Sequence, residues 1–204
     1  MRKTVIIVAV LLVALAGGAW LYLRPTELKP PPQGAALDEA LASGEVILET
    51  EPVEGTTTPR MKLRAVIDAP PEKVWAIIED CGRYEETMIR MEESEELSRE
   101  GDTVVCRGVV DMPFPLSNLT ATTKATHTVE PQKLYRRAWT MVEGDYKRNE
   151  GSWTLTPYNG DARRTLVDYQ IVVEPDIEVP DSVRIAAQQK ALPDLIEKLR
   201  EQVR

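Results

Sequence analysis

The sequence is poor in the residues and motifs on which most catalytic sites are built. It holds one histidine and two cysteines among 204 residues. It contains no Gly-x-Ser-x-Gly, His-Glu-x-x-His, phosphate-loop or Gly-x-Gly-x-x-Gly motif. Two cysteines have neither the number nor the spacing of a zinc site. We therefore expect no metal and no cofactor, and we assign no catalytic residue, although a carboxylate pair among the 33 acidic residues stays an open alternative.

Long runs of Lys and Arg are also missing, and the net charge is -8. Binding to a phosphate backbone needs clustered positive charge, so nucleic acid is not an expected partner. Hydrophobic residues make up 43% and charged residues 28% of the chain, which is typical of a folded protein. At this length we expect one domain with an appendage. Nothing in the sequence indicates an oligomeric state.

The N-terminus carries one long uncharged run. Arg2 and Lys3 precede residues 5–23, which contain no charged side chain and as a helix would extend about 28 Å, close to the thickness of a bilayer core. We predict that residues 1–24 form a membrane anchor, with the rest of the chain outside the cytoplasm. A signal peptide cleaved at residues 14–16 is the alternative, and the chain would then be secreted. We prefer the anchor because the apolar run continues past that cleavage site.

A linker and a single domain are expected to follow. Residues 25–36 hold four prolines, which is typical of an extended linker, and the domain should span residues 37–204. Outside the cytoplasm Cys81 and Cys106 could form a disulfide, or both could stay as buried thiols. We expect thiols, because the sequence does not supply the Cα separation that a disulfide requires.

The hydrophobic pattern predicts an antiparallel sheet covered by a final helix. Alternation of apolar and polar residues predicts strands at residues 45–53, 60–67, 104–112, 119–129, 134–142, 150–156 and 165–173. Prolines at 70–71 fit only the start of a helix, and a second short helix is expected at 84–91. A long helix should run from residue 181 or 182 to about 203, bend at Pro193 and cover one face of the sheet.

Three stretches resemble one superfamily of proteins. Residues 66–84 contain Asp-Ala-Pro-Pro-Glu-Lys-Val-Trp, residues 151–157 read Gly-Ser-Trp-Thr-Leu-Thr-Pro, and residues 177–203 lead from Val-Pro into a helix with Ala-Leu-Pro. In this order they resemble the START-like, or SRPBCC, superfamily of polyketide cyclases, coenzyme-Q-binding proteins and lipid-transfer proteins. The resemblance implies an α+β helix-grip fold, in which a curved antiparallel sheet wraps around the long C-terminal helix and two short helices follow an early strand. Here an N-terminal apolar helix would be added.

The resemblance also implies an internal cavity for a lipid, sterol, quinone or polyketide. The candidate ligand contacts are Met88, Cys106, Val110, Met112, Ala125, His127, Trp139, Trp153, Tyr169, Ile185 and Leu192. We expect the domain to bind or transfer a hydrophobic small molecule beside the membrane. The alternatives are a cyclase or hydrolase that uses the same cavity, and an interaction module whose interior is filled by its own side chains.

Three residues on the predicted strands raise the question of polar groups inside the domain. His127 is expected to be a hydrogen-bonded core residue rather than an acid or base, since no partner stands at a useful spacing. Arg136 and Arg137 are neighbours in one strand, so one of them must face the covered side. A buried arginine needs a carboxylate or an acidic ligand headgroup. We expect a salt bridge with Asp168 or Glu150.

Overall fold

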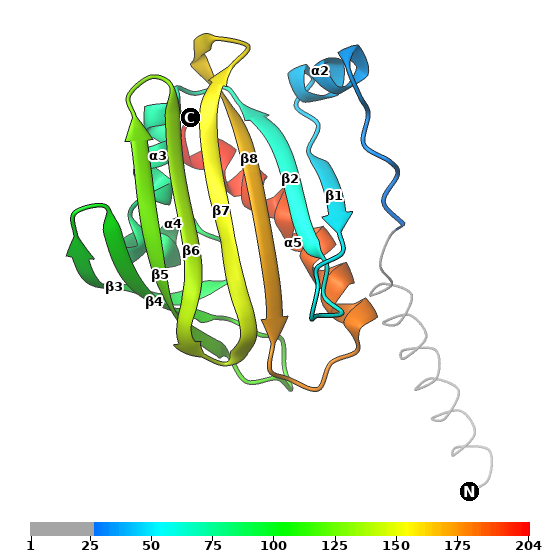
Figure 1. Ribbon diagram of the computed structural model, residues 1–204, viewed down its shortest axis with the longest axis vertical. Coiled ribbons are helices and arrows are strands. Elements are labelled where there is room, and N and C mark those ends of the chain that lie inside the picture. The colour runs from blue at the N-terminus through cyan, green and yellow to red at the C-terminus, as the bar shows by residue number, and fades with distance from the viewer. Residues whose placement is uncertain (1–26) are drawn as a thin grey trace, which may run out of the picture.

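The computed structural model describes residues 27–204, and its strands form one curved antiparallel sheet of eight strands (Figure 1). The strand order is β1-β2-β8-β7-β6-β5-β4-β3. The bounds are β1 Ile47–Glu51, β2 Arg60–Ile67, β3 Met91–Glu100, β4 Thr103–Val110, β5 Leu119–Glu130, β6 Leu134–Gly144, β7 Tyr146–Tyr158 and β8 Asp161–Pro175. The predicted anchor or signal segment lies outside the described residues.

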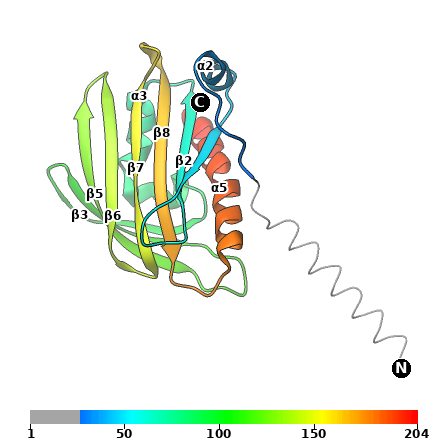
Figure 2. The same cartoon turned by 45° about the vertical axis from the view of Figure 1, so that its right-hand side comes forward.

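Helices cover one face of this sheet. On that face lie α3 Pro71–Ile78, a 3-10 turn η1 at Cys81–Arg83, α4 Tyr84–Thr87 and α5 Asp181–Gln202, whereas α2 Ala35–Ala42 packs on Ile47 and Val66, whose side chains point to the opposite face. Figures 1 and 2 show α5 lying along the sheet on the side away from the viewer of Figure 1, with α3 beside it. Among residues 27–204, no helix combines the length and the apolar character needed to cross a bilayer. The sheet gripping a long terminal helix is the arrangement that the resemblance implied.

The alternation predicted for residues 60–67 is confirmed in β2. Met61, Leu63, Ala65 and Ile67 point toward α5 and are at most 1% exposed. Their polar neighbours lie on the outer face, because successive side chains in a strand point to opposite sides. Burial of this inner row anchors β2 between β1 and β8.

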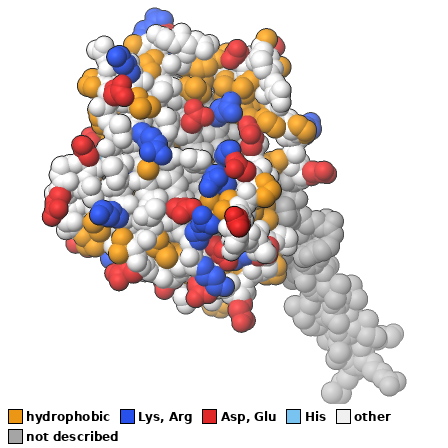
Figure 3. Space-filling model, in the orientation of Figure 1, with side chains coloured by type: hydrophobic (Ala, Val, Ile, Leu, Met, Phe, Trp, Pro, Cys, Tyr) orange, Lys and Arg blue, Asp and Glu red, His pale blue; other side chains and the backbone are white. Residues whose placement is uncertain are grey.

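The outer face carries paired charges on β1, β2 and β8. Figure 3 shows acidic and basic side chains interleaved over this side of the molecule. Lys62 pairs with Glu51, and Arg64 lies 3.7 Å from Glu49 and 3.3 Å from Asp168 between the nearest charged atoms. Such exposed pairs add little stability. Their main effect is to keep this side of the sheet in water, so the apolar face is the one that needs cover.

Prolines determine where the two main helices begin. Pro71 is the first residue of α3 and Pro70 precedes it, as expected of a residue with fixed φ and no N–H to donate. Pro180 likewise precedes α5, which starts at Asp181, one of the two predicted positions, and has no side-chain cap. Pro193 lies inside α5, as the pattern predicted.

Two elements were not predicted. Helix α2 starts at Ala35, inside the stretch described above as a linker, and its Leu41 packs on Ile47, Val66 and Tyr158. Strand β3 is the acid-rich segment at the edge of the sheet, and most of its side chains are exposed. An edge strand with both faces wet lacks the apolar alternation that reveals other strands, and its charges discourage pairing with another chain.

Candidate functional site: a cavity under the sheet

Between the sheet and α5, the side chains leave a cavity of about 360 Å³. Small-molecule pockets in proteins occupy about 300–1,000 Å³. The inner faces of β4 to β8 form its roof, and residues of α5 and of the segment that follows α4 form its other walls. The apolar residues that border it include Met88, Ile89, Met91, Cys106, Val110, Ala121, Ile171, Val173, Ala191, Leu192 and Leu195. The domain therefore has an interior space that its own side chains do not fill.

Three aromatic residues form a wall of the cavity. The rings of Trp153 and Tyr169 have centroids 4.1 Å apart, and those of Trp139 and Tyr169 are 6.0 Å apart. The indole N–H of Trp139 donates to Asn149 Oδ1 at 3.0 Å. Burial raises the pKa of Tyr169, so its phenol stays neutral. This wall offers a large apolar surface whose polar atoms are few.

Gly151 makes room for this wall. A Cβ built at this position would lie 2.3 Å from the carbonyl oxygen of Gln170 and 2.6 Å from the ring of Trp139. Neither the backbone nor a packed indole can move aside cheaply. Glycine in the Gly-Ser-Trp stretch is thus required so that Trp139 can cross β7 beside Trp153.

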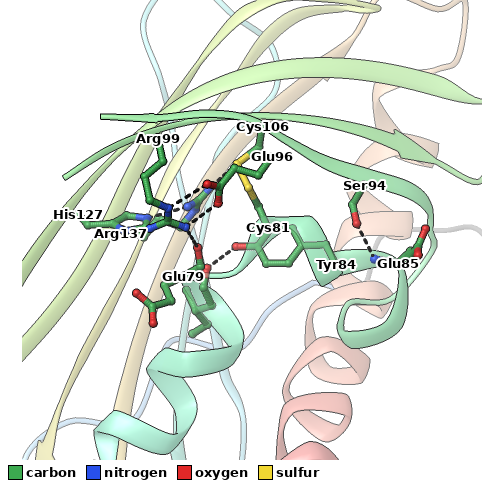
Figure 4. The surroundings of a disulfide bond; sticks show 11 residues. Glu79, Cys81, Tyr84, Glu85, Ser94, Glu96, Arg99, Cys106, His127 and Arg137 are labelled. Atoms are coloured by element: carbon green, nitrogen blue, oxygen red, sulfur yellow. Dashed lines mark hydrogen bonds and ion pairs between the residues drawn. A yellow bond between two sulfur atoms is a disulfide. The ribbon is translucent and has the colours of Figure 1, made fainter. Parts of the chain in front are cut away.

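Arg137 is the charged group buried deepest beside the cavity. It lines the cavity and is 3% exposed. Its guanidinium lies 2.7 Å from Nε2 of His127 and donates to Sγ of Cys106 at 3.1 Å. Its Cζ lies 5.8 Å from the centre of the Tyr84 ring. Figure 4 shows these side chains in one group between the strands and the short helices.

His127 supports Arg137 and does not face the cavity. The pKa of its imidazole is lowered to about 4, first by burial and then by the positive charge of Arg137. Because a guanidinium only donates, the neutral ring must accept at Nε2 and carry its proton on Nδ1. The other side of the ring meets Trp75 edge-on, at 5.0 Å between centroids. This matches the expectation of a hydrogen-bonded core residue.

The salt bridge expected for the inward arginine is absent. Asp168 pairs with Arg64, and Glu150 pairs with Arg148. Both acids alternate with inward residues of β7 and β8 and therefore point to the outer face, opposite to Arg137. The predicted salt bridge was wrong because Asp168 and Glu150 lie on the outer face of the sheet, whereas Arg137 points to the inner face.

The two cysteines form a disulfide, which corrects the expectation of free thiols. Cys81 in η1 and Cys106 in β4 have Cα atoms 6.3 Å apart, within the range that a disulfide allows. Both residues border the cavity. The bond therefore joins the short helices to the sheet at the cavity wall, next to Arg137.

The cavity contains little that could perform acid–base chemistry. No Asp, Glu or His side chain lines it in the part of the chain that the structure describes. The pKa of Tyr146 in its lining is raised to about 12, chiefly by burial. Over the same residues, no group of three or more His, Cys, Asp or Glu side chains is placed to hold a metal ion.

Residues 67–200 match the family described as polyketide cyclase / dehydrase and lipid transport, and this match spans more than half of the sequence. The chain belongs to this family. No curated relative matches it.

Solved structures share the fold of this family member. A STAR-related lipid transfer protein from Xanthomonas axonopodis is similar over 87% of this chain and 97% of its own, with a TM-score of 0.69 and 18% identity. Human StAR-related lipid transfer protein 5 is similar over 96% and 95%, with a TM-score of 0.67 and 14% identity. The Zhui aromatase/cyclase from Streptomyces sp. R1128 is similar over 71% and 90%, with a TM-score of 0.51 and 18% identity. At such identities the likeness shows the fold alone.

Most of the candidate contacts proposed from the sequence border the cavity in this START-like domain. They are Met88, Cys106, Val110, Trp139, Trp153, Tyr169 and Leu192.

The remaining candidates lie elsewhere, for local reasons. Met112 follows the end of β4 and packs in a separate cluster with Leu119 and Tyr146. Ala125 is fully buried between its larger register partners on the neighbouring strands. His127 lies beside Arg137, and Ile185 lies in the first turns of α5, ahead of the helix residues that line the cavity.

Many residues of the cavity lining were not among the candidates, and Gln188 and Tyr84 illustrate why. Gln188 of α5 donates from Nε2 to the carbonyl oxygen of Val173 at 3.1 Å, while its buried Oε1 has no partner. A signal existed, since Gln188 falls on the same helical stripe as Ile185 and Leu192. Tyr84 gave no such signal, because α4 is too short to show a periodic pattern.

Proposed function

We propose that the domain binds one hydrophobic small molecule in the cavity beneath the sheet and carries or senses it. The observation that supports this most directly is the 360 Å³ space itself, which an interaction module with a filled interior would lack. Removal of a ligand's apolar surface from water would supply the affinity, at about 25 cal/mol per Å². We assign contact with the ligand to the seven candidate residues that border the cavity.

The family and its fold support this proposal. The family description includes lipid transport as well as cyclases, and two of the similar structures are lipid transfer proteins by name. The cyclase alternative needs an acid and a base that converge on a substrate. A cavity without carboxylate or imidazole in its described lining favours binding over such catalysis.

We further propose that the domain works outside the cytoplasm, held to the membrane by residues 1–24. The uncharged run of residues 5–23 supports the anchor. The disulfide supports the compartment, because such bonds persist mainly in oxidising environments. Because both cysteines are buried, cells would be denatured in the presence of a maleimide reagent, and Cys81 and Cys106 should be labelled only after reduction. Labelling without a reductant would contradict this location.

The binding proposal is tested by filling the cavity. Ala191 borders it from α5, whereas Ala187 on the same helix is exposed. The full-length chain and the variants Ala191→Phe and Ala187→Phe would be purified, extracted with organic solvent and analysed by mass spectrometry. We expect a reproducible co-purified molecule with wild type and Ala187→Phe, and its loss with Ala191→Phe. Equal amounts in both variants, or none in wild type, would contradict binding in this cavity.

A further inference from the structure

Arg137 carries a charge that no described side chain neutralises by direct contact. It is 3% exposed and borders the cavity, yet its hydrogen bonds go to an imidazole nitrogen and a disulfide sulfur. Tyr84 adds the face of a neutral ring. A buried cation is costly unless an anion compensates it. A methionine or leucine at this position would complete the apolar wall without that cost, so the presence of an arginine calls for an explanation.

Glu96, an acidic group that Arg137 acts on, is bonded to another arginine. Arg137 contributes to lowering the pKa of Glu96, so the two charges do act on each other. The carboxylate of Glu96 is nevertheless bonded to Arg99, at 2.9 and 2.6 Å from its two nitrogens. Figure 4 shows this second arginine beside Arg137 on the side of β3. Glu79, Asp80 and Asp102 also lie close enough to act on Arg99 or His127, but no salt bridge joins any of these described side chains to Arg137.

We propose that the ligand of this cavity is an amphipathic molecule with an acidic headgroup, a carboxylate or a phosphate, whose anionic oxygens bind the guanidinium of Arg137. Its apolar part lies along the Trp139 and Tyr169 wall. This inference rests on the proposed binding function and names the class of ligand. It also explains the inward arginine, for which the acids on the outer face are out of reach.

The contacts of Arg137 leave donors for such a headgroup. A guanidinium has five N–H donors in a fixed plane, and one contact at each terminal nitrogen is accounted for by His127 and Cys106. Both neighbours are held in place, the first against Trp75 and the second by its disulfide. The plane of the guanidinium is therefore set before a ligand arrives. Preorganised donors favour planar or bidentate recognition of an anionic oxygen pair.

Matched amphiphiles test the headgroup on the full-length chain. Oleate, oleyl phosphate and oleyl alcohol share one hydrocarbon chain and differ in charge, and acetate and inorganic phosphate represent the headgroups alone. Titration calorimetry would give each dissociation constant. We expect wild type to bind oleate or oleyl phosphate at least about tenfold more tightly than oleyl alcohol, as a hydrogen-bonded charge implies. The tighter of the two anions identifies the headgroup.

Arg137→Gln should abolish this preference. It should weaken binding of the anionic probe by about tenfold or more and leave oleyl alcohol unchanged, while Arg137→Lys should retain part of the preference. Arg136→Gln is the control, since it removes the same charge from the neighbouring, partly exposed position on the opposite face of β6. An equal loss with Arg136→Gln would mean that overall charge, and not Arg137, attracts the anion.

The wild-type measurements alone can overturn the inference, even if Arg137→Gln fails to fold. Equal affinity for oleate, oleyl phosphate and oleyl alcohol would overturn the acidic headgroup and leave the proposed binding function intact. Binding of acetate or phosphate as tightly as their oleyl counterparts would show a site for a small free anion instead. No binding of any amphiphile would overturn both proposals.

Discussion

The two ends of the space between α5 and the sheet are packed in different ways. Near the end of α5, Ile196 and Leu199 are fully buried in the cluster that contains Leu63, Leu155 and Val167. Nearer the middle of the helix, Gln188, Ala191, Leu192 and Leu195 instead border the cavity. The same helix therefore closes one end of the domain and leaves the other hollow.

Helix α3 accounts for much of this difference in packing. Val74, Trp75 and Ile78 of α3 enter the filled end and complete its core. At the hollow end the corresponding wall is the segment that follows α4, with Met88 and Met91 beside the cavity. An apolar stripe on a helix thus indicates which side of the helix is buried. It does not say whether enough side chains meet there to fill the volume.

The largest expected effect comes from truncating a leucine at the filled end. Leu199→Ala should lower the free energy of unfolding by about 3 to 5 kcal/mol, because a fully buried side chain leaves a new cavity. Leu192→Ala, where the side chain already borders a space, should cost about 2 kcal/mol. Urea unfolding of both variants measures this. Equal losses would mean that the hollow end is as tightly packed as the other.

Replacing an inward alanine by a larger residue should also lower stability more at the filled end than at the hollow end. Ala65 and Ala121 both face inward from strands, but Ala65 is 0% exposed in the main core whereas Ala121 borders the cavity. Ala65→Leu should destabilise by about 1 to 3 kcal/mol through overpacking, and Ala121→Leu by less than about 1 kcal/mol. Thermal unfolding of the pair is the measurement. A larger penalty at Ala121 would be incompatible with open space beneath β5.

Local chemistry made much of the fold predictable from the sequence. Alternation located β2 and its inward face, and Pro71 located the start of α3, because each rests on geometry that neighbouring residues alone determine. The stripe on α5 likewise identified its buried side. Strand β3 was not predicted because both of its faces are wet. Helix α2 was not predicted because it is short and follows a proline-rich stretch.

For the site, the sequence could predict only which side of its own strand or helix a residue faces. That one of Arg136 and Arg137 points inward follows from the period of a strand, but the partner of Arg137 depends on which residues share its side of other strands. Asp168 fails that condition, while His127 meets it through register. The disulfide and the cavity volume depend on distances between elements, which no periodicity contains. Of the seven candidate contacts that border the cavity, six stand at inward strand positions or on the α5 stripe, where periodicity is informative, and Met88 does not.

His127 stands where the two ends meet, between Trp75 of the filled end and Arg137 of the hollow one, and its contribution to stability depends on pH. Its pKa is lowered to about 4 by burial, Arg137 and Arg99, against the opposite pull of Asp102 and Glu96. At a pH between this value and the ordinary pKa of 6.5, the imidazole is protonated in the unfolded chain and neutral in the folded chain. Stability from this group is therefore complete above about pH 6.5 and is lost as pH falls toward 4, by at most about 1.4 kcal/mol per pH unit.

The variant His127→Gln isolates that contribution, because its amide oxygen can still accept from Arg137 and carries no titrating group. Urea unfolding between pH 4 and 7 would compare the slopes of the two proteins, which share the titration of every carboxylate. We expect the wild-type free energy of unfolding to fall more steeply with acid than that of His127→Gln, and the curves to run parallel above about pH 6.5. Parallel curves throughout would mean that the imidazole takes up its proton in the folded state. The boundary between the two ends would then be open to water, and Arg137 would face a charged neighbour instead of a neutral acceptor.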